Sequence, residues 1–336
     1  MRIAIDALGG DLAPAEPVKA ACQAAARHPD HEMLLVGDEG TVRAELGKIG
    51  PSPANVRVVA SDGAIAMDAE PVSALRRQPR ASIPACVGLV KSGEAAAMVS
   101  AGNTGACVAG AMFGLNRLPG VRRPGIGATL PSLSTAGHCI LIDVGANVNC
   151  KPVNLFQYAV MGMALSQLVL RVERPRVGLL SIGEEDAKGN PLVKETHRLF
   201  RAEQAFDFIG NVEGRDIFGG GVDVVVCEGF VGNAVLKVAE GVTETLFRSI
   251  RDEVAAMAGG GETDRALGTA LQRLRARCDY AETGGAPLLG LDGHCQICHG
   301  RSDARAILNA VTGAVRMVDV GVNARITEAL AARAKA

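Results

Sequence analysis

The regular alternation of short apolar runs with longer helical patterns is the feature that most constrains how this chain folds. The apolar runs are rich in Val and Ile, whereas the segments between them repeat apolar residues at the spacing of one helix face. This order is typical of βαβ units and predicts an α/β fold, with three αβα layers around a mostly parallel sheet. The expected strands are Arg2–Asp6, Met33–Val36, Val56–Val59, Ala96–Ser100, Ile126–Leu130, Cys139–Asp143, Arg176–Ile182, Phe206–Ile209, Asp223–Cys227 and Cys295–His299. The expected helices include Pro17–Arg27, Thr104–Leu115, Val153–Val169 and Ser302–Val318.

The core of such a fold must here be aliphatic. Apolar residues make up 48% of the 336 residues, but aromatic residues make up only 3% and Trp is absent. Val, Ile, Leu and Ala suit buried parallel strands covered by helices. No Pro/Ser-rich linker divides the chain, so we expect one large α/β catalytic domain over residues 1–336. The net charge of −1 gives no global attraction to nucleic acid, and we expect no nucleic-acid partner.

The cysteines and the apolar segments point to a cytoplasmic protein. The start of the chain, a short strand and a Gly-rich loop, lacks the long apolar core of a signal peptide. No uninterrupted apolar run reaches the length of about 18 residues that a spanning helix needs. The nine cysteines are scattered, which does not suit a disulfide framework.

One stretch interrupts the α/β alternation. From Val242 to Cys278 there is no strand pattern, and two helical patterns flank Gly259–Gly261. We therefore predict a helical hairpin insertion over residues 242–278. Its apolar faces are Leu246, Ile250, Val254 and Met257 on the first helix and Leu267, Leu271, Leu274 and Cys278 on the second, with Arg265, Arg273, Arg275 and Arg277 nearby. Two roles remain open: packing, including a dimer contact, or a basic apolar tip that touches an anionic membrane.

Loops of similar chemistry follow six of the expected strands. They combine Gly with Asp, Asn, Ser or Thr, and one also carries a lysine. In open parallel sheets ligands bind at the carboxyl ends of the strands, so we expect all six loops at one edge. Gly lets backbone N–H groups approach a ligand, and helix starts bind anions, so phosphate or a phosphorylated ligand is the expected occupant. The loops are Asp6–Asp11, Ala101–Gly105, Val144–Asn147, Gly183–Asn190, Glu228–Asn233 and Gly300–Ser302.

Other motifs point away from metals and familiar cofactors. The chain has no G-x-G-x-x-G after its first strand, no P-loop and no nucleophile elbow. Cys295–His299 fits C-x-x-C-H, but it reads as a buried strand and stands alone, which does not suit haem or zinc. The acidic run Glu184–Asp186 suits a solvated turn better than a metal site, and Cys227 reads as a buried thiol. His299 is either a ligand contact or a structural histidine.

These loops resemble, in order and spacing, those of the acyl-acyl-carrier-protein:phosphate acyltransferase (PlsX) family. The resemblance covers nearly the whole chain and departs from the family at Leu8, Leu12 and Arg301. The matching stretches are Ile5–Asp11, Ser100–Gly105, Asp143–Asn147, Ile182–Glu185, Lys188–Asn190, Asn211–Asp216, Gly229–Asn233 and Gly284–Gly290.

The resemblance implies a reaction in which inorganic phosphate attacks the thioester of a long-chain acyl group on acyl carrier protein. The acyl phosphate would pass to a membrane glycerol-3-phosphate acyltransferase of phospholipid synthesis. The resemblance also implies a homodimer and a fold like that of phosphate acetyltransferases and isocitrate/isopropylmalate dehydrogenases. A dehydrogenase would need a cluster of Asp ligands and an Arg-rich site, which the sequence does not show. A phosphate acetyltransferase-like enzyme using acyl-CoA is the nearest alternative.

This reaction needs a positioned phosphate and a stabilised oxyanion, but no metal and no cofactor, because the thioester is already activated. We therefore expect two catalytic residues, Lys188 holding the phosphate and Asn233 polarising the thioester carbonyl. The residues expected to bind phosphate or substrate are Asp6, Gly9, Gly10, Asp11, Ser100, Asn103, Thr104, Asp143, Asn147, Gly232 and His299.

Overall fold

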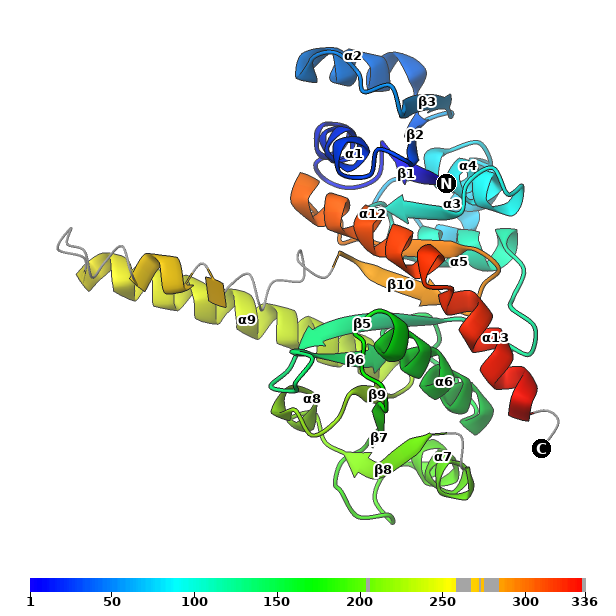
Figure 1. Cartoon of the computed structure of the whole chain (residues 1–336), viewed down its shortest axis with the longest axis vertical. Helices are drawn as coiled ribbons and strands as arrows, with labels where there is room; N and C mark the ends of the chain where they lie inside the picture. Colours follow the sequence, from blue (N-terminus) through cyan, green and yellow to red (C-terminus); the bar gives the residue numbers. More distant parts are fainter. Residues whose placement is uncertain (204–205, 258–266, 272, 275–283, 334–336) are drawn as a thin grey trace.

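The fold is one mostly parallel sheet covered by helices. The computed structural model describes residues 1–203, 206–257, 267–271, 273–274 and 284–333. Across these residues eleven strands form a sheet in the order β3-β2-β1-β4-β11-β10-β5-β6-β9-β7-β8 (Figure 1). Seven neighbouring pairs are parallel and three antiparallel, which confirms the predicted α/β class. The strands are β1 (Arg2–Asp6), β2 (Glu32–Gly37), β3 (Val56–Ala60), β4 (Ala97–Ser100), β5 (Gly125–Pro131), β6 (His138–Ile142), β7 (Arg176–Leu180), β8 (Asp207–Val212), β9 (Val224–Val226), β10 (Ala286–Leu289) and β11 (His294–Ile297).

The sheet consists of two parallel halves that run in opposite directions. Strands β3, β2, β1, β4 and β11 are parallel to one another, and so are β6, β9, β7 and β8. Between them, β10 pairs antiparallel with both β11 and β5, and β5 pairs antiparallel with β6. The loops after β1, β4 and β11 therefore leave the sheet at one end of its strands, and those after β6, β7 and β9 at the other. The expectation that all six loops share one edge is wrong, because the connection 132–137 makes β5 and β6 a hairpin.

Helices cover both faces of the sheet, because successive side chains of a strand point to opposite faces. On β1, Ile3 and Ile5 pack with α1 and α12, whereas Ala4 packs with α4 and α5. Figure 1 shows how the helices lie around the sheet. On β6, Ile140 and Ile142 pack with α6 and α13. The helices are α1 (Ala15–Arg27), α2 (Glu39–Ile49), α3 (Pro71–Arg77), α4 (Ser82–Lys91), α5 (Thr104–Gly114), α6 (Pro152–Leu168), α7 (Pro191–Ala202), α8 (Asp216–Gly219), α9 (Gly229–Met257), α12 (Ala304–Asp319) and α13 (Val322–Arg333).

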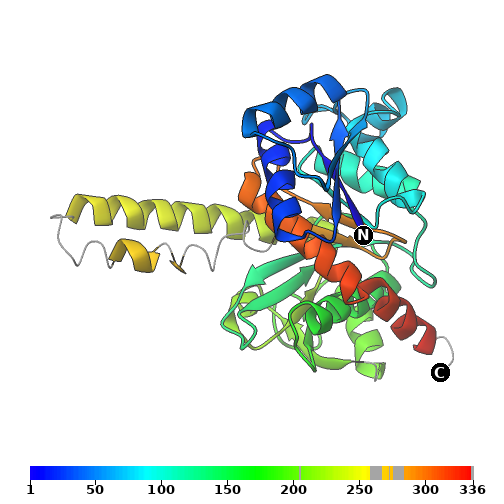
Figure 2. The same ribbon diagram turned by 45° about the horizontal axis from the view of Figure 1, so that its top comes forward.

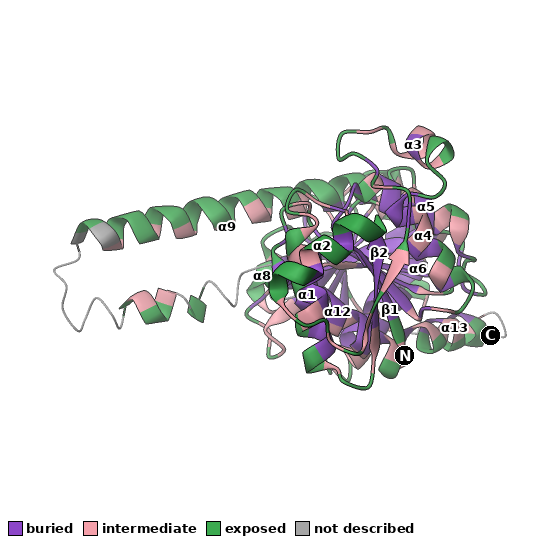
Figure 3. Cartoon of the chain, turned by 90° about the horizontal axis from the view of Figure 1, so that it is seen from above, coloured by how far each residue is buried: buried purple, intermediate pink, exposed green. Residues whose placement is uncertain are grey.

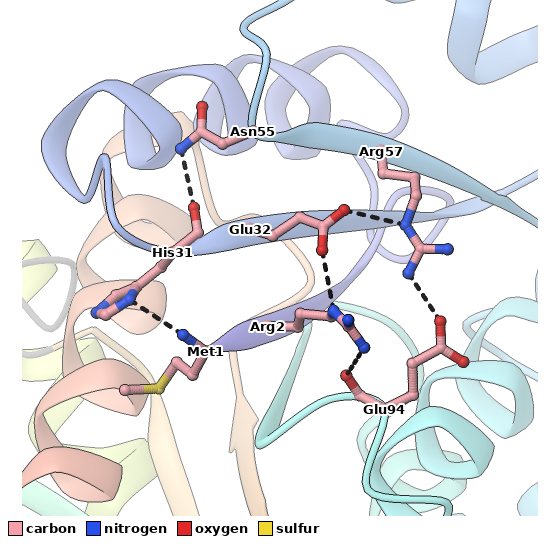
Figure 4. Close-up of polar contacts among 7 residues, drawn as sticks. All are labelled: Met1, Arg2, His31, Glu32, Asn55, Arg57 and Glu94. Atoms are coloured by element: carbon pink, nitrogen blue, oxygen red, sulfur yellow. Dashed lines mark hydrogen bonds and ion pairs between the residues drawn. The ribbon is translucent and has the colours of Figure 1, made fainter.

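Surface ion pairs tie the strands together near the amino-terminal ends of β1 and β2. Glu32 on β2 accepts from Arg2 Nε at 3.0 Å and from Arg57 Nε at 3.1 Å (Figure 4). Arg57 also reaches Glu94, with 2.7 Å between Nη2 and Oε1. These side chains are partly exposed to solvent, so each pair contributes about 1 kcal/mol or less.

Helix α9 extends far out of the body of the molecule (Figure 2). Beyond its first turns α9 is mostly exposed (Figure 3). Its exposed residues include Val238, Val242 and Leu246, which are spaced one turn apart. Among the described helices, none is long and apolar enough to cross a membrane.

The hairpin predicted for residues 242–278 differs from the structure at its start. Its first helix is the second half of α9, which begins at Gly229 directly after β9. Residues 267–271 and 273–274 are helical, in agreement with part of the predicted second helix. Gly259–Gly261, Arg265, Arg275, Arg277 and Cys278 lie outside the described residues.

Candidate active site

Asp6 and Ser100 organise the loops after β1 and β4. The Ser100 hydroxyl donates to Asp6 Oδ2 at 2.6 Å, and the Leu8 N–H donates to Asp6 Oδ1 at 3.2 Å. Ser100 Oγ also accepts from the Gly102 N–H at 3.0 Å. Both side chains are buried, and burial raises the pKa of the Asp6 carboxyl despite these hydrogen bonds. These two side chains therefore fix the shape of the loops, and their role in ligand binding stays a prediction.

The loops after β1, β4 and β11 touch one another through glycines. A Cβ at Gly9 would lie 2.7 Å from the Gly102 nitrogen, and one at Gly10 would lie 3.0 Å from the Gly300 oxygen. The Asp11 N–H donates to that same Gly300 oxygen at 2.7 Å. This contact confirms that three of the six loops lie together.

Asn103 is fully used within the protein. Its side-chain oxygen caps α5 by accepting from the Ala106 N–H at 2.9 Å. Its amide group donates to the carbonyls of Ala66, Met67 and Ala69 at 3.0–3.1 Å. It therefore has no donor left for a phosphate, whereas Thr104, the first residue of α5, is exposed.

Asp143 fixes the loop after β6, in the second half of the sheet, as Asp6 fixes the loop after β1 in the first half. It is fully buried and accepts from the N–H groups of Gly145, Ala146 and Asn147 at 2.8–3.2 Å. It also accepts from the Ile126 N–H at 3.0 Å and from the Asn147 amide at 3.3 Å. Burial raises the pKa of the Asp143 carboxyl, and the N–H donors oppose that rise.

The start of α9 packs closely onto this loop. The Gly229 N–H donates to the backbone carbonyl oxygen of Asn147 at 2.8 Å. A Cβ at Gly232 would overlap the Asp143 carbonyl oxygen, so only glycine fits there. Asn233 is exposed and lies against Gly145, where an added Cβ would be 3.8 Å from the amide oxygen. The loop after β6 and the start of α9 thus form a second cluster around Asn233.

The cap of α9 is Glu228. Its carboxylate accepts from the Phe230 N–H at 2.7 Å and from the Val231 N–H at 3.0 Å. Asn233 therefore does not cap this helix, and its amide does not serve the first turn.

Lys188 lies in the loop after β7, the neighbour of β9 in the sheet. The Lys188 side chain is exposed. The loop is fixed by the Asn211 amide, which donates to the Glu185 oxygen at 2.8 Å. Glu184 pairs with Arg215 at 3.1 Å and Asp186 with Arg201 at 3.4 Å, so this acidic run is largely neutralised by arginines.

His299 stands where α9 approaches the first cluster. Its side chain is exposed, yet partial desolvation of the ring lowers its pKa, and the positive charge of Lys237 lowers it further. The Arg301 N–H donates to His299 Nδ1 at 3.2 Å. Lys237 lies one turn beyond Asn233 on α9 and is near enough to His299 to lower its pKa. Helix α9 therefore passes close to His299 after it leaves the second cluster.

Two charged residues near these clusters, Arg123 and Lys237, were not singled out from the sequence, and Glu228 was named only as part of a loop. Arg123 Nη1 donates to the Asn147 side-chain oxygen at 3.3 Å. Arg123 and Lys237 belong to no motif, although Lys237 could have been found from its helical spacing of four residues from Asn233.

The cysteines considered in the sequence are buried thiols. Cys227 is buried, as expected, and burial raises its pKa well above the ordinary value. Burial also raises the pKa of Cys295 and of Cys298 to about 12. In the described part of the chain, no three His, Cys, Asp or Glu side chains are grouped so that they could hold a metal ion.

The fold is that of phosphotransacetylases. A phosphotransacetylase from Streptococcus pyogenes superimposes with a TM-score of 0.63 over 95% of this chain and 94% of that one, at 17% identity. The EutD phosphotransacetylase from Staphylococcus aureus gives a TM-score of 0.60 over 94% of both chains, also at 17% identity. By its fold, the chain is therefore an α/β protein with the architecture found in phosphotransacetylases.

Sequence comparison gives the family. The family described as "Fatty acid synthesis protein" matches residues 1–325. A "Phosphate acyltransferase" of Myxococcus xanthus (strain DK1622) is 47% identical over 332 residues, covering 98% of this chain and 94% of its own. A "Phosphate acyltransferase" of Thermosynechococcus vestitus is 47% identical over 325 residues, covering 97% and 94%. The chain belongs to this family of acyltransferases, as the resemblance of its loops predicted.

Proposed function

We propose that the chain transfers a long-chain acyl group from acyl carrier protein to inorganic phosphate. A phosphate oxygen attacks the thioester carbon, the carbon–sulfur bond breaks, and the carrier thiol leaves with a proton. The observation that carries this proposal is the near full-length similarity to relatives named phosphate acyltransferase. The burial of Cys227 agrees with it, because phosphate itself is the nucleophile.

Asn233 and Lys188 are proposed as the catalytic pair. An Asn amide donates to a developing oxyanion without needing protonation, and Asn233 is exposed beside a loop that Asp143 holds rigid. Lys188 supplies a positive charge from the neighbouring strand's loop. We expect Asn233→Ala to lower kcat by about 10²-fold and Lys188→Ala to lose about 2 kcal/mol or more in kcat/KM for phosphate. Near-normal kinetics in either variant would refute that residue's role.

The donor distinguishes this proposal from its alternative, a phosphate acetyltransferase-like enzyme that uses acyl-CoA. The test is thiol release from palmitoyl-acyl carrier protein and from palmitoyl-CoA, each with and without phosphate. We expect phosphate-dependent release with a higher kcat/KM for the carrier protein. Preference for the CoA thioester would favour the alternative.

Carrier binding is proposed to be electrostatic, because acyl carrier proteins are acidic. Since the net charge of this chain is −1, the attraction must come from a local basic patch. The candidates for that patch are Arg265, Arg273, Arg275, Arg277 and Arg316, of which Arg273 and Arg316 are among the described residues. The KM for the carrier should rise steeply as salt increases above about 0.1 M. A KM that is independent of salt would contradict this.

We further propose that the chain is a cytoplasmic homodimer that contacts anionic membranes, where a glycerol-3-phosphate acyltransferase takes up the acyl phosphate for phospholipid synthesis. The exposed apolar side chains of α9, together with Leu267 and Leu274, support a contact of this kind. The test is sedimentation with anionic vesicles, comparing wild type with Leu267→Glu/Leu271→Glu. Equal sedimentation of a dimeric double mutant would refute the membrane role, and loss of the dimer would assign these leucines to the dimer contact.

A further inference from the structure

The backbone N–H groups around Asn233 are already used within the protein. In the loop after β6, the Val144 N–H donates to the Ile126 oxygen, and the next three N–H groups donate to Asp143. In the first turn of α9, Gly229 donates to the Asn147 oxygen and Gly232 to the Glu228 oxygen. The two N–H groups between them donate to the Glu228 carboxylate. An anion bound beside Asn233 must therefore be held by side chains.

Arg123 is the cation placed next to these loops. It immediately precedes Pro124, and its Nη1 donates to the Asn147 side-chain oxygen at 3.3 Å. Asn147 is itself fixed, because its amide donates to the Pro124 oxygen at 2.6 Å and to Asp143 at 3.3 Å. The Arg123 side chain is exposed, and among the described residues it forms no ion pair with a carboxylate. Its other N–H donors can therefore meet a ligand.

We infer that Arg123 binds the phosphate that attacks the thioester, beside Asn233. Both side chains lie next to the Asp143–Asn147 loop. Asn147 accepts a hydrogen bond from Arg123, and a Cβ added at Gly145 would lie 3.8 Å from the Asn233 side chain. A guanidinium presents a planar fork of donors that matches two oxygens of a phosphate, whereas a lysine offers a point charge. Arg123 thus supplies two donors for the phosphate, which the backbone N–H groups cannot supply because they already donate within the protein. This inference rests on the proposed function.

The kinetic test compares Arg123→Ala, Arg123→Lys and Arg122→Ala. Arg122 is the matched control, because it is the neighbouring exposed arginine. Its described hydrogen bonds, with Gln157 and Arg117, are made by its backbone and not by its side chain. Arg123→Ala should raise the KM for phosphate about tenfold or more, the scale of one charged hydrogen bond, while the KM for the acyl donor stays at the wild-type value. Arg123→Lys should recover part of the loss, and Arg122→Ala should behave as wild type.

A binding test separates this inference from the proposed function. Inorganic phosphate should raise the Tm of wild type above its value in sodium chloride of equal ionic strength, because it binds the folded state. That rise should be lost in Arg123→Ala. If the rise is lost as expected but no variant releases thiol, the proposed function fails and the phosphate site stands. If Arg123→Ala keeps the rise, if phosphate does not raise the wild-type Tm, or if both KM values change alike, the inference is overturned.

Discussion

Replacing Gly232 by alanine should test the contact on which the candidate site depends. An added Cβ would overlap the Asp143 carbonyl oxygen and lie 2.9 Å from both the Asp143 carbonyl carbon and Cys227 Sγ. None of these atoms can turn aside, because two are backbone and the third is a buried thiol. Since favourable contacts between such atoms lie near 3.5 Å, the start of α9 and the Asp143 loop must separate by more than about 1 Å.

This displacement has a cost in stability and in catalysis. Overpacking of this kind destabilises proteins by about 3 kcal/mol. A shift of about 1 Å at a catalytic group lowers the rate by about 10²-fold. We therefore expect Gly232→Ala to lower both the stability and kcat, since Asn233 is the next residue.

The matched control is Gly241→Ala on the same helix, where an added Cβ would meet nothing within 4 Å. It should gain about 0.5–1 kcal/mol, because alanine favours a helix over glycine. Urea unfolding followed by far-UV circular dichroism gives the stabilities, and phosphate-dependent thiol release gives kcat. Equal stability of the two variants would refute the steric argument. A destabilised Gly232→Ala with wild-type kcat would remove the start of α9 from the catalytic site.

Three further predictions concern the N-terminal cap of α5, a buried histidine and the reactivity of the cysteine thiols. Asn103→Ala should lose about 2–3 kcal/mol in urea unfolding, because it removes the α5 cap and leaves three carbonyls unpaired; wild-type stability would contradict this. Burial lowers the pKa of His294 to about 4. As the pH falls, the imidazole of His294 is protonated in the unfolded chain before it is protonated in the folded protein. The free energy of unfolding should therefore fall by about 3 kcal/mol between pH 6.5 and 4. In His294→Gln this part of the pH dependence should vanish, and an unchanged profile would refute the assignment. Among the described cysteines only Cys22 and Cys150, which are half-buried, should react with a thiol reagent in the folded protein; labelling of buried Cys107 would contradict this.

Much of the fold could be predicted because strand pattern and burial agree. Residues Arg2–Asp6 alternate between two packed faces, and both faces needed apolar side chains. The predicted strand at Phe206 begins at Asp207 and runs on to Val212 in the structure. Strand β10 was missed because Ala286–Leu289 is short, contains a proline and follows two glycines, which together resemble a turn.

The reversal between the two halves was also missed, although the connection 132–137 carries the signal. A parallel crossover needs about a dozen residues, so a link of this length between two strands indicates a hairpin. Strand direction, more than strand position, decides which loops can meet.

The candidate site was harder to predict, because one set of residue types serves two purposes. Asp, Asn and Ser at strand ends bind ligands, but they also cap helices and fix loops. Asp6, Asn103 and Asp143 fix loops in the structure, and this role is decided by burial and by partners distant in sequence, such as Ile126. Lys188, Asn233 and His299 remain predictions as ligand contacts.

The position of β10 and β11 has a consequence for synthesis of the chain. These strands lie between β4 and β5, so they complete the hydrogen bonding of both halves although they are the last strands to be made. Until residues 286–297 have emerged from the ribosome, β4 and β5 each present an unpaired edge to other chains. Pairing across such long sequence separations is slow, which prolongs that exposure. A nascent chain of this protein should therefore depend on chaperones late in translation, when most of its helices can already form.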